Sequence, residues 1–117
     1  MKYALIGCGR IAVNHIKAAV NNKLEIVAVC DVDLKQIDIL FEKTNYTGNP
    51  DRYEDYKEMI KAHPEIELAA IATESGVHAE IALYCIDHGI NVIIEKPMAM
   101  SMKDAEEIIR CSEEKHV

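Results

Sequence analysis

Short apolar runs recur along the chain, and longer segments with helical periodicity separate them. The runs lie at about residues 2–6, 24–30, 68–72 and 91–94, with a much shorter candidate at 46–47. Each long run is apolar throughout instead of alternating with polar residues. Runs of this kind are typical of parallel strands that are buried on both faces. The pattern therefore predicts a mostly parallel sheet covered by helices.

The segments between these runs predict five helices. We expect them at about residues 10–21, 34–43, 51–62, 77–88 and 102–115. Three of these helices have a residue pair with capping-box spacing at their expected start, which favours helix formation there. The pairs are Asp33 with Gln36, Asp51 with Glu54, and Ser101 with Asp104.

A regular alternation of strand and helix limits the topology. Crossovers between parallel strands are right-handed, so the chain predicts a doubly wound α/β sheet of the Rossmann type, in the order 3-2-1-4-5. Its 117 residues suit a single domain spanning residues 1–117. Ligands of such sheets bind beyond the carboxyl ends of the strands. The loops expected at that edge are residues 7–10, 31, 73–76 and 95–97.

The first of these loops has the spacing Gly-x-Gly-x-x-Ala, which is typical of dinucleotide-binding folds. Gly7 permits a tight turn, Gly9 lets the backbone approach a pyrophosphate, and Ala12 keeps the helix close to the strand. The following helix directs N–H groups and a partial positive charge at the phosphates. The candidate pyrophosphate-binding residues are therefore Gly7, Cys8, Gly9, Arg10, Ile11 and Ala12.

An acid follows the second apolar run at the distance expected for a ribose ligand. Asp31 lies 19 residues past Ala12, and a carboxylate there accepts hydrogen bonds from ribose hydroxyls. It would repel a 2′-phosphate, which favours NAD over NADP, although Arg10 is a cation within reach of a phosphate. The alternative is an ordinary turn at the two glycines, with Asp31 only capping the next helix. A Rossmann-like domain for another nucleotide, such as CoA, is a further alternative, and Asp31 argues against it because its carboxylate suits a free ribose diol.

Composition narrows the classes of partner. The chain has 20 acidic and 13 basic residues and a net charge of −7, which argues against nucleic acid. It contains no apolar run of 18 residues and no signal peptide, so we expect no membrane partner and a cytoplasmic protein. Its four cysteines are widely spaced, and its five histidines lack zinc-site spacing. We expect neither a disulfide framework nor a metal.

A second candidate site follows the last apolar run. Glu95, Lys96 and Pro97 come directly after the strand expected at 91–94. A lysine at this edge can orient a substrate hydroxyl or stabilise an alkoxide, and partial desolvation would lower its pKa enough for acid–base chemistry. Pro97 restricts the backbone at Lys96. The alternative is a helix-entry loop whose charges are simply solvated.

Together these motifs resemble the N-terminal half of the Gfo/Idh/MocA oxidoreductases, and the resemblance covers essentially the whole chain. The matching stretches are residues 6–12 with His15, Cys30-Asp31, 73–80 and 95–99. The family implies an NAD(P)-dependent oxidation of a sugar or cyclitol hydroxyl to a ketone, or the reverse. Within the family, the glycine loop and residues 73–80 look similar to nucleotide-sugar 3-dehydrogenases of the UDP-N-acetylglucosaminuronate type.

The resemblance also implies roles for individual residues. Thr73 would flank the cofactor, and Glu95 and Lys96 would lie beside the nicotinamide ribose. Lys96 would reach the substrate hydroxyl and is the candidate catalytic residue. His78 stands at the same edge and is a further cofactor-side candidate, but we favour a structural role in which it packs against the Thr73 loop.

The resemblance further implies a second α+β domain, mostly an antiparallel sheet, which is absent from these 117 residues. That domain would hold the sugar or nucleotide-sugar substrate and would often mediate homo-oligomer assembly. We therefore expect an excised or truncated cofactor domain that binds NAD but does not turn over a sugar by itself. The alternative is a stand-alone nucleotide-binding or redox-sensing module without catalysis.

Overall fold

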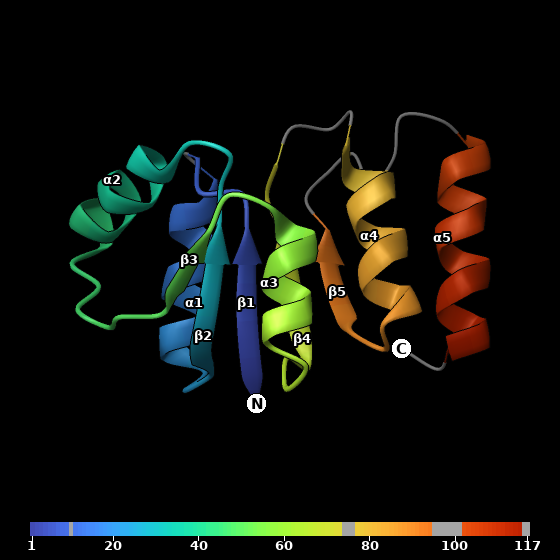
Figure 1. Ribbon diagram of the computed structural model, residues 1–117, viewed down its shortest axis with the longest axis horizontal. Coiled ribbons are helices and arrows are strands. Elements are labelled where there is room, and N and C mark those ends of the chain that lie inside the picture. The colour runs from blue at the N-terminus through green and yellow to red at the C-terminus, as the bar shows by residue number, and fades with distance from the viewer. Residues whose placement is uncertain (10, 74–76, 95–101, 116–117) are drawn as a thin grey trace.

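The computed structural model describes residues 1–9, 11–73, 77–94 and 102–115, which form one layered α/β unit (Figure 1). Five strands alternate with five helices along the described residues. The strands are β1 (Lys2–Ile6), β2 (Glu25–Cys30), β3 (Asp51–Tyr53), β4 (Leu68–Ile71) and β5 (Asn91–Ile94). The helices are α1 (Ala12–Asn21), α2 (Leu34–Thr44), α3 (Tyr56–Ala62), α4 (His78–Asp87) and α5 (Met102–Lys115).

All neighbouring strands are parallel, in the order β3-β2-β1-β4-β5, which confirms the predicted doubly wound sheet. The register aligns the strand ends, since Ile6 of β1 pairs with Cys30 of β2 on one side and with Ile71 of β4 on the other. The loops that follow these three strands therefore emerge side by side, at the top of the sheet in Figure 1.

Helices cover the sheet from two sides, and alternate strand residues point to each. Ile6 belongs to the core beneath α3, α4 and α5, whereas the adjacent Leu5 belongs to the core beneath α1 and α2. Figure 1 shows α3 in front of the sheet and α1 behind it. The central strands are buried on both sides, as their continuous apolar runs predicted. The edge strand β5 differs, because Ile93 is 44% exposed.

The third strand is not where the sequence pattern placed it. We expected it at residues 46–47, but Tyr46 lies outside the sheet and packs edge-on against Phe41, with ring centroids 5.0 Å apart. Strand β3 is formed instead by Asp51–Tyr53. The predicted capping box of Asp51 with Glu54 is therefore wrong, since Asp51 lies in a strand. Asp55 caps α3, and its side chain accepts a hydrogen bond from the Lys57 N–H at 2.9 Å.

The predicted start of α2 is confirmed, but its capping box is not reciprocal. The Asp33 side chain accepts from the Lys35 N–H at 3.1 Å. In a capping box, the Asp33 N–H would donate to the side chain of Gln36. Here the Asp33 N–H donates to Asp31 Oδ1 instead, at 2.8 Å. The third predicted box begins at Ser101, which lies outside the described residues. None of the described helices is long and apolar enough to cross a membrane.

Candidate functional site

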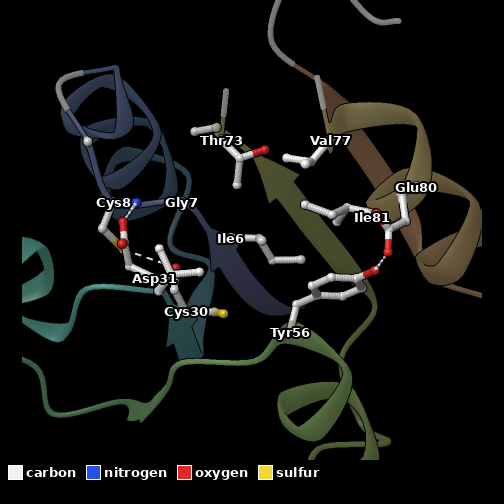
Figure 2. Close-up of a pocket in the computed structure, with 13 residues that line it drawn as sticks. Ile6, Gly7, Cys8, Cys30, Asp31, Tyr56, Thr73, Val77, Glu80 and Ile81 are labelled. Atoms are coloured by element: carbon white, nitrogen blue, oxygen red, sulfur yellow. Dashed lines mark hydrogen bonds between the residues drawn. The ribbon is translucent and has the colours of Figure 1, made fainter. Parts of the chain in front are cut away.

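A cleft of about 490 Å³ opens at the carboxyl edge of the sheet. Its walls come from the residues that follow β1, β2 and β4 and from the first turns of α3 and α4. Figure 2 shows Cys8 and Asp31 on one side, Tyr56, Glu80 and Ile81 on the other, and Ile6 between them. The volume lies in the range of small-molecule and cofactor sites.

Gly7 is required by the packing of the protein itself. Its φ is +93°, a conformation that side chains disfavour. A Cβ at Gly7 would lie 2.6 Å from the Ala72 carbonyl carbon and 2.6 Å from the Thr73 nitrogen. The Gly7 N–H also donates to the Cys30 carbonyl at 2.8 Å. Gly7 thus joins the ends of the three central strands.

Gly9 differs from Gly7, because no contact with the described residues requires it to lack a side chain. A Cβ at Gly9 would meet no described atom within 4 Å, and no positive φ forces a glycine at this position. Gly9 lines the cleft, and the space beside it is open. A ligand that approaches the backbone closely explains a glycine here better than protein packing does.

The backbone N–H groups of the glycine loop divide into two sets. Those of Gly7 and Cys8 donate to groups at the end of β2, and that of Ala12 donates to the Gly9 carbonyl at 3.1 Å. Among the described residues, no hydrogen-bond acceptor is found for the N–H groups of Gly9 and Ile11. Helix α1 begins at this loop, and no described side chain caps it. The described residues supply no side-chain acceptor at the positive end of the helix, which is a favourable place for an anion.

Asp31 organises the loops on both sides of it. Its Oδ2 accepts a hydrogen bond from the Cys8 N–H at 2.8 Å, and its Oδ1 accepts one from the Asp33 N–H at 2.8 Å. Its own N–H donates to the Tyr53 carbonyl at 3.0 Å. The N-terminal cap of α2 is Asp33 and not Asp31. Each carboxylate oxygen keeps a lone pair with which to accept from a ribose hydroxyl.

The cysteines at the cleft are packing residues. Cys8 is buried, and its Sγ donates to the Cys30 carbonyl at 3.5 Å. Burial, supported by the neighbouring Asp31 charge, raises the pKa of the Cys8 thiol to about 12, and burial does the same for Cys30. Both thiols are therefore protonated at neutral pH and are poor nucleophiles. Cys8 serves the loop through its backbone N–H.

His78 holds the loop that contains Thr73, as the sequence led us to expect. It is 1% exposed, and its Nε2 lies 2.7 Å from the Thr73 carbonyl oxygen. A carbonyl only accepts, so Nε2 carries the proton and donates. Thr73 lines the cleft, whereas His78 lies behind it. This contact ties the start of α4 to the end of β4.

Two polar cleft residues, Tyr56 and Glu80, were not identified by the sequence analysis. The Tyr56 hydroxyl donates to Glu80 Oε1 at 3.3 Å across the gap between α3 and α4. Burial, together with the Glu80 charge, raises the pKa of Tyr56. No cleft role could be inferred for Tyr56 because α3 was expected to start five residues too early. Glu80 falls within the family-like stretch 73–80, but no motif assigned it a function.

The remaining sequence candidates lie outside the described residues. They are Arg10, Glu95 and Lys96. Among the described residues that line the cleft none is basic, and no described cluster of His, Cys, Asp or Glu is arranged to hold a metal ion. The positive potential that the described part offers a pyrophosphate therefore comes from backbone N–H groups.

A glycine loop at the end of the first strand and an acid at the end of the second define a dinucleotide-binding Rossmann domain. The comparison with known families agrees: the model described as "Oxidoreductase family, NAD-binding Rossmann fold" matches residues 1–117. The chain belongs to this family, Gfo/Idh/MocA.

Relatives within the family are dehydrogenases of polyhydroxylated compounds. The chain is 33% identical over 110 residues to D-glucoside 3-dehydrogenase of Escherichia coli, covering 92% of the chain and 30% of the relative. It is 26% identical over 115 residues to inositol 2-dehydrogenase of Salmonella paratyphi B, covering 97% of the chain and 33% of the relative.

Among solved structures, the WlbA dehydrogenase of Chromobacterium violaceum, in complex with NADH and UDP-GlcNAcA, matches with a TM-score of 0.86 and 29% identity. The match covers 99% of this chain and 33% of that one. The chain thus spans about a third of the length of the curated relatives that it matches.

Proposed function

We propose that the chain is the NAD-binding domain of an oxidoreductase that moves a hydride between nicotinamide and a hydroxyl of a sugar, cyclitol or nucleotide sugar. The observation that carries this proposal is the open space at Gly9 beside the Asp31 carboxylate. Packing among the described residues accounts for Gly7 but not for Gly9, whereas the close approach of a bound dinucleotide would account for Gly9.

The chain's own residues would hold the dinucleotide as follows. The N–H groups of Gly9 and Ile11 bind the pyrophosphate, with Arg10 as the nearby cation. Asp31 accepts from the hydroxyls of the adenosine ribose and repels a 2′-phosphate, which favours NAD over NADP. Thr73 lines the cleft beside them. When bound, NAD supplies the hydride acceptor.

Catalysis is assigned to the second candidate site. We propose that Glu95 and Lys96 lie by the nicotinamide ribose and that Lys96 orients the substrate hydroxyl. Support for the substrate class comes from relatives that are dehydrogenases of a glucoside and of inositol, and from a structural neighbour in complex with UDP-GlcNAcA.

The rest of the enzyme would lie in a second domain that holds the substrate and supports a homo-oligomer. Hydride transfer needs nicotinamide and substrate in register, so the 117-residue chain alone is expected to bind NAD without oxidising a sugar. The four free cysteines, three of them buried, support a reducing compartment such as the cytoplasm.

Calorimetric titration of the chain with NAD, NADP and CoA tests the cofactor assignment. We expect NAD to bind about tenfold or more tightly than NADP, because the Asp31 carboxylate gains hydrogen bonds from a ribose diol and repels a phosphate. Asp31→Asn should narrow this preference, since the amide keeps an acceptor oxygen for the Cys8 N–H but loses the charge and the acceptor for the Asp33 N–H.

Asp31→Ala is the matched comparison, because it also removes the hydrogen bond that organises the glycine loop. Asp31→Ala should weaken the binding of both NAD and NADP and should also lower the free energy of unfolding. Equal affinity of the wild type for NAD and NADP would refute the role of Asp31. Tighter binding of CoA than of NAD would refute the cofactor assignment.

A further inference from the structure

We propose that the Tyr56–Glu80 pair sets the base specificity of the cleft by receiving the exocyclic amino group of adenine, with Glu80 as the acceptor and Tyr56 as the positioning residue. The inference rests on the proposed NAD function and adds base recognition to it. The juxtaposition that carries it is a hydrogen-bonded phenol–carboxylate pair on the wall opposite Asp31 (Figure 2).

The cleft has chemically distinct sides. The side formed by the glycine loop and Asp31 offers N–H groups and a carboxylate, which suit a pyrophosphate and a ribose. The opposite side carries the Tyr56–Glu80 pair, and the lining around it is apolar and includes Ile6, Val77 and Ile81. A base is bonded directly to its ribose, so a ribose held at Asp31 places the base among these apolar side chains.

The apolar residues suit the flat face of a heteroaromatic ring. Ile6 and Ile81 are 2% and 4% exposed, so packing within the core holds their side chains in place. Val32, which follows Asp31 and also lines the cleft, is 86% exposed. Covering its side chain with a ring removes apolar surface from water, which favours binding. These contacts hold a base but do not distinguish one base from another.

Discrimination needs a polar group at the ring edge, and the Tyr56–Glu80 pair supplies it. The raised pKa of Tyr56 keeps the phenol protonated, so its O–H donates to Glu80 Oε1. Oε2 and the remaining lone pair of Oε1 stay available as acceptors. An amino group at position 6 of a purine donates to such a carboxylate, whereas a carbonyl oxygen there is repelled.

The pair is held in place before any ligand arrives. Glu80 is exposed and Tyr56 half-buried, so the tyrosine is the better-fixed partner. The Tyr56 ring packs edge-on against Tyr84 of α4, with ring centroids 5.4 Å apart. Helices α3 and α4 thus fix the phenol, and the phenol orients the carboxylate.

The test compares NAD with nicotinamide hypoxanthine dinucleotide, in which a carbonyl replaces the amino group, by calorimetric titration of the chain. We expect the wild type to prefer NAD by about tenfold, in line with one charge-assisted hydrogen bond. Glu80→Gln should bring the two affinities within about threefold, because the amide can also donate to a carbonyl. Tyr56→Phe should narrow the ratio as well, since the carboxylate loses the group that orients it.

Glu58→Gln, an exposed acid on α3, is the charge-matched control and should leave the ratio unchanged. Thermal unfolding of each variant separates loss of fold from loss of specificity. An unchanged ratio in Glu80→Gln, or equal binding of both dinucleotides by the wild type, would overturn the inference while leaving the NAD assignment intact. Failure of the wild type to bind either dinucleotide would contradict the NAD assignment and this inference together.

Discussion

Gly7 and Gly9, only two residues apart, serve different purposes. Gly7 is fixed by a φ of +93° and by backbone atoms 2.6 Å from its absent Cβ, whereas Gly9 borders open space. The Gly-x-Gly spacing identifies both residues but does not distinguish their roles. Only the strand register, which brings Ala72 and Thr73 against Gly7, makes one of them structural.

This difference predicts opposite effects of two alanine variants. Gly7→Ala should lower the free energy of unfolding by about 2 kcal/mol, because it combines a disfavoured φ with a backbone clash. Gly9→Ala should change the free energy of unfolding by less than about 1 kcal/mol and should weaken NAD binding by about tenfold or more. Urea unfolding and calorimetry measure the two effects. A Gly9→Ala chain that binds NAD like the wild type would show that the open space is not the pyrophosphate site.

The position of Asp31 could be predicted from the sequence, but its hydrogen bonds could not. Its spacing from the glycine loop predicted its place at the cleft. Its bonds to the Cys8 and Asp33 N–H groups depend on how two loops meet in space, and no spacing rule reports them. Any substitution of Asp31 therefore affects the conformation of the two loops as well as ribose binding.

At the scale of elements, the edge strand β3 and helix α3 were the hardest to predict. The strand is three residues long, and two of these residues are exposed, so it has no apolar run to mark it. Two consecutive acid pairs share the capping-box spacing, Asp51 with Glu54 and Asp55 with Glu58. The structure uses Asp55 as the cap. Sequence pattern gives no reason to prefer the second pair.

A histidine between two carboxylates ties these elements together at the edge opposite the cleft. His63 Nε2 lies 2.9 Å from Asp51 Oδ2, and its Nδ1 lies 2.8 Å from Glu65 Oε2. The contacts join the start of β3 to the end of α3 and to the loop before β4. The hydrogen bond from His63 lowers the pKa of Glu65 below its ordinary value.

This arrangement predicts an acid-sensitive contribution to stability. Because the folded-state pKa of Glu65 is lowered, its contribution is present above about pH 4.5 and is lost as the pH falls through the lowered value. Urea unfolding midpoints should therefore differ between the wild type and Glu65→Gln at pH 6 and converge towards pH 3. Glu54→Gln, an exposed acid, is the control. A Glu65→Gln effect of the same size at both pH values would contradict the proposed tie.

At the scale of the whole molecule, the sheet order and both helical layers follow from the sequence. Continuous apolar runs specify buried parallel strands, and right-handed crossovers leave few ways to arrange them. The Tyr56–Glu80 wall was not foreseen, because it depends on how α3 and α4 pack against each other. The chain spans about a third of the length of its curated relatives.

The central claim is that a dinucleotide binds across the carboxyl edge of this sheet. A titration of the ¹⁵N-labelled chain with NAD, followed by amide NMR, tests it most directly. We predict saturable shifts at Gly7, Gly9, Ile11, Asp31 and Thr73, with little change around the His63 contacts at the opposite edge. The absence of saturable shifts, or the largest shifts at that opposite edge, would contradict the account.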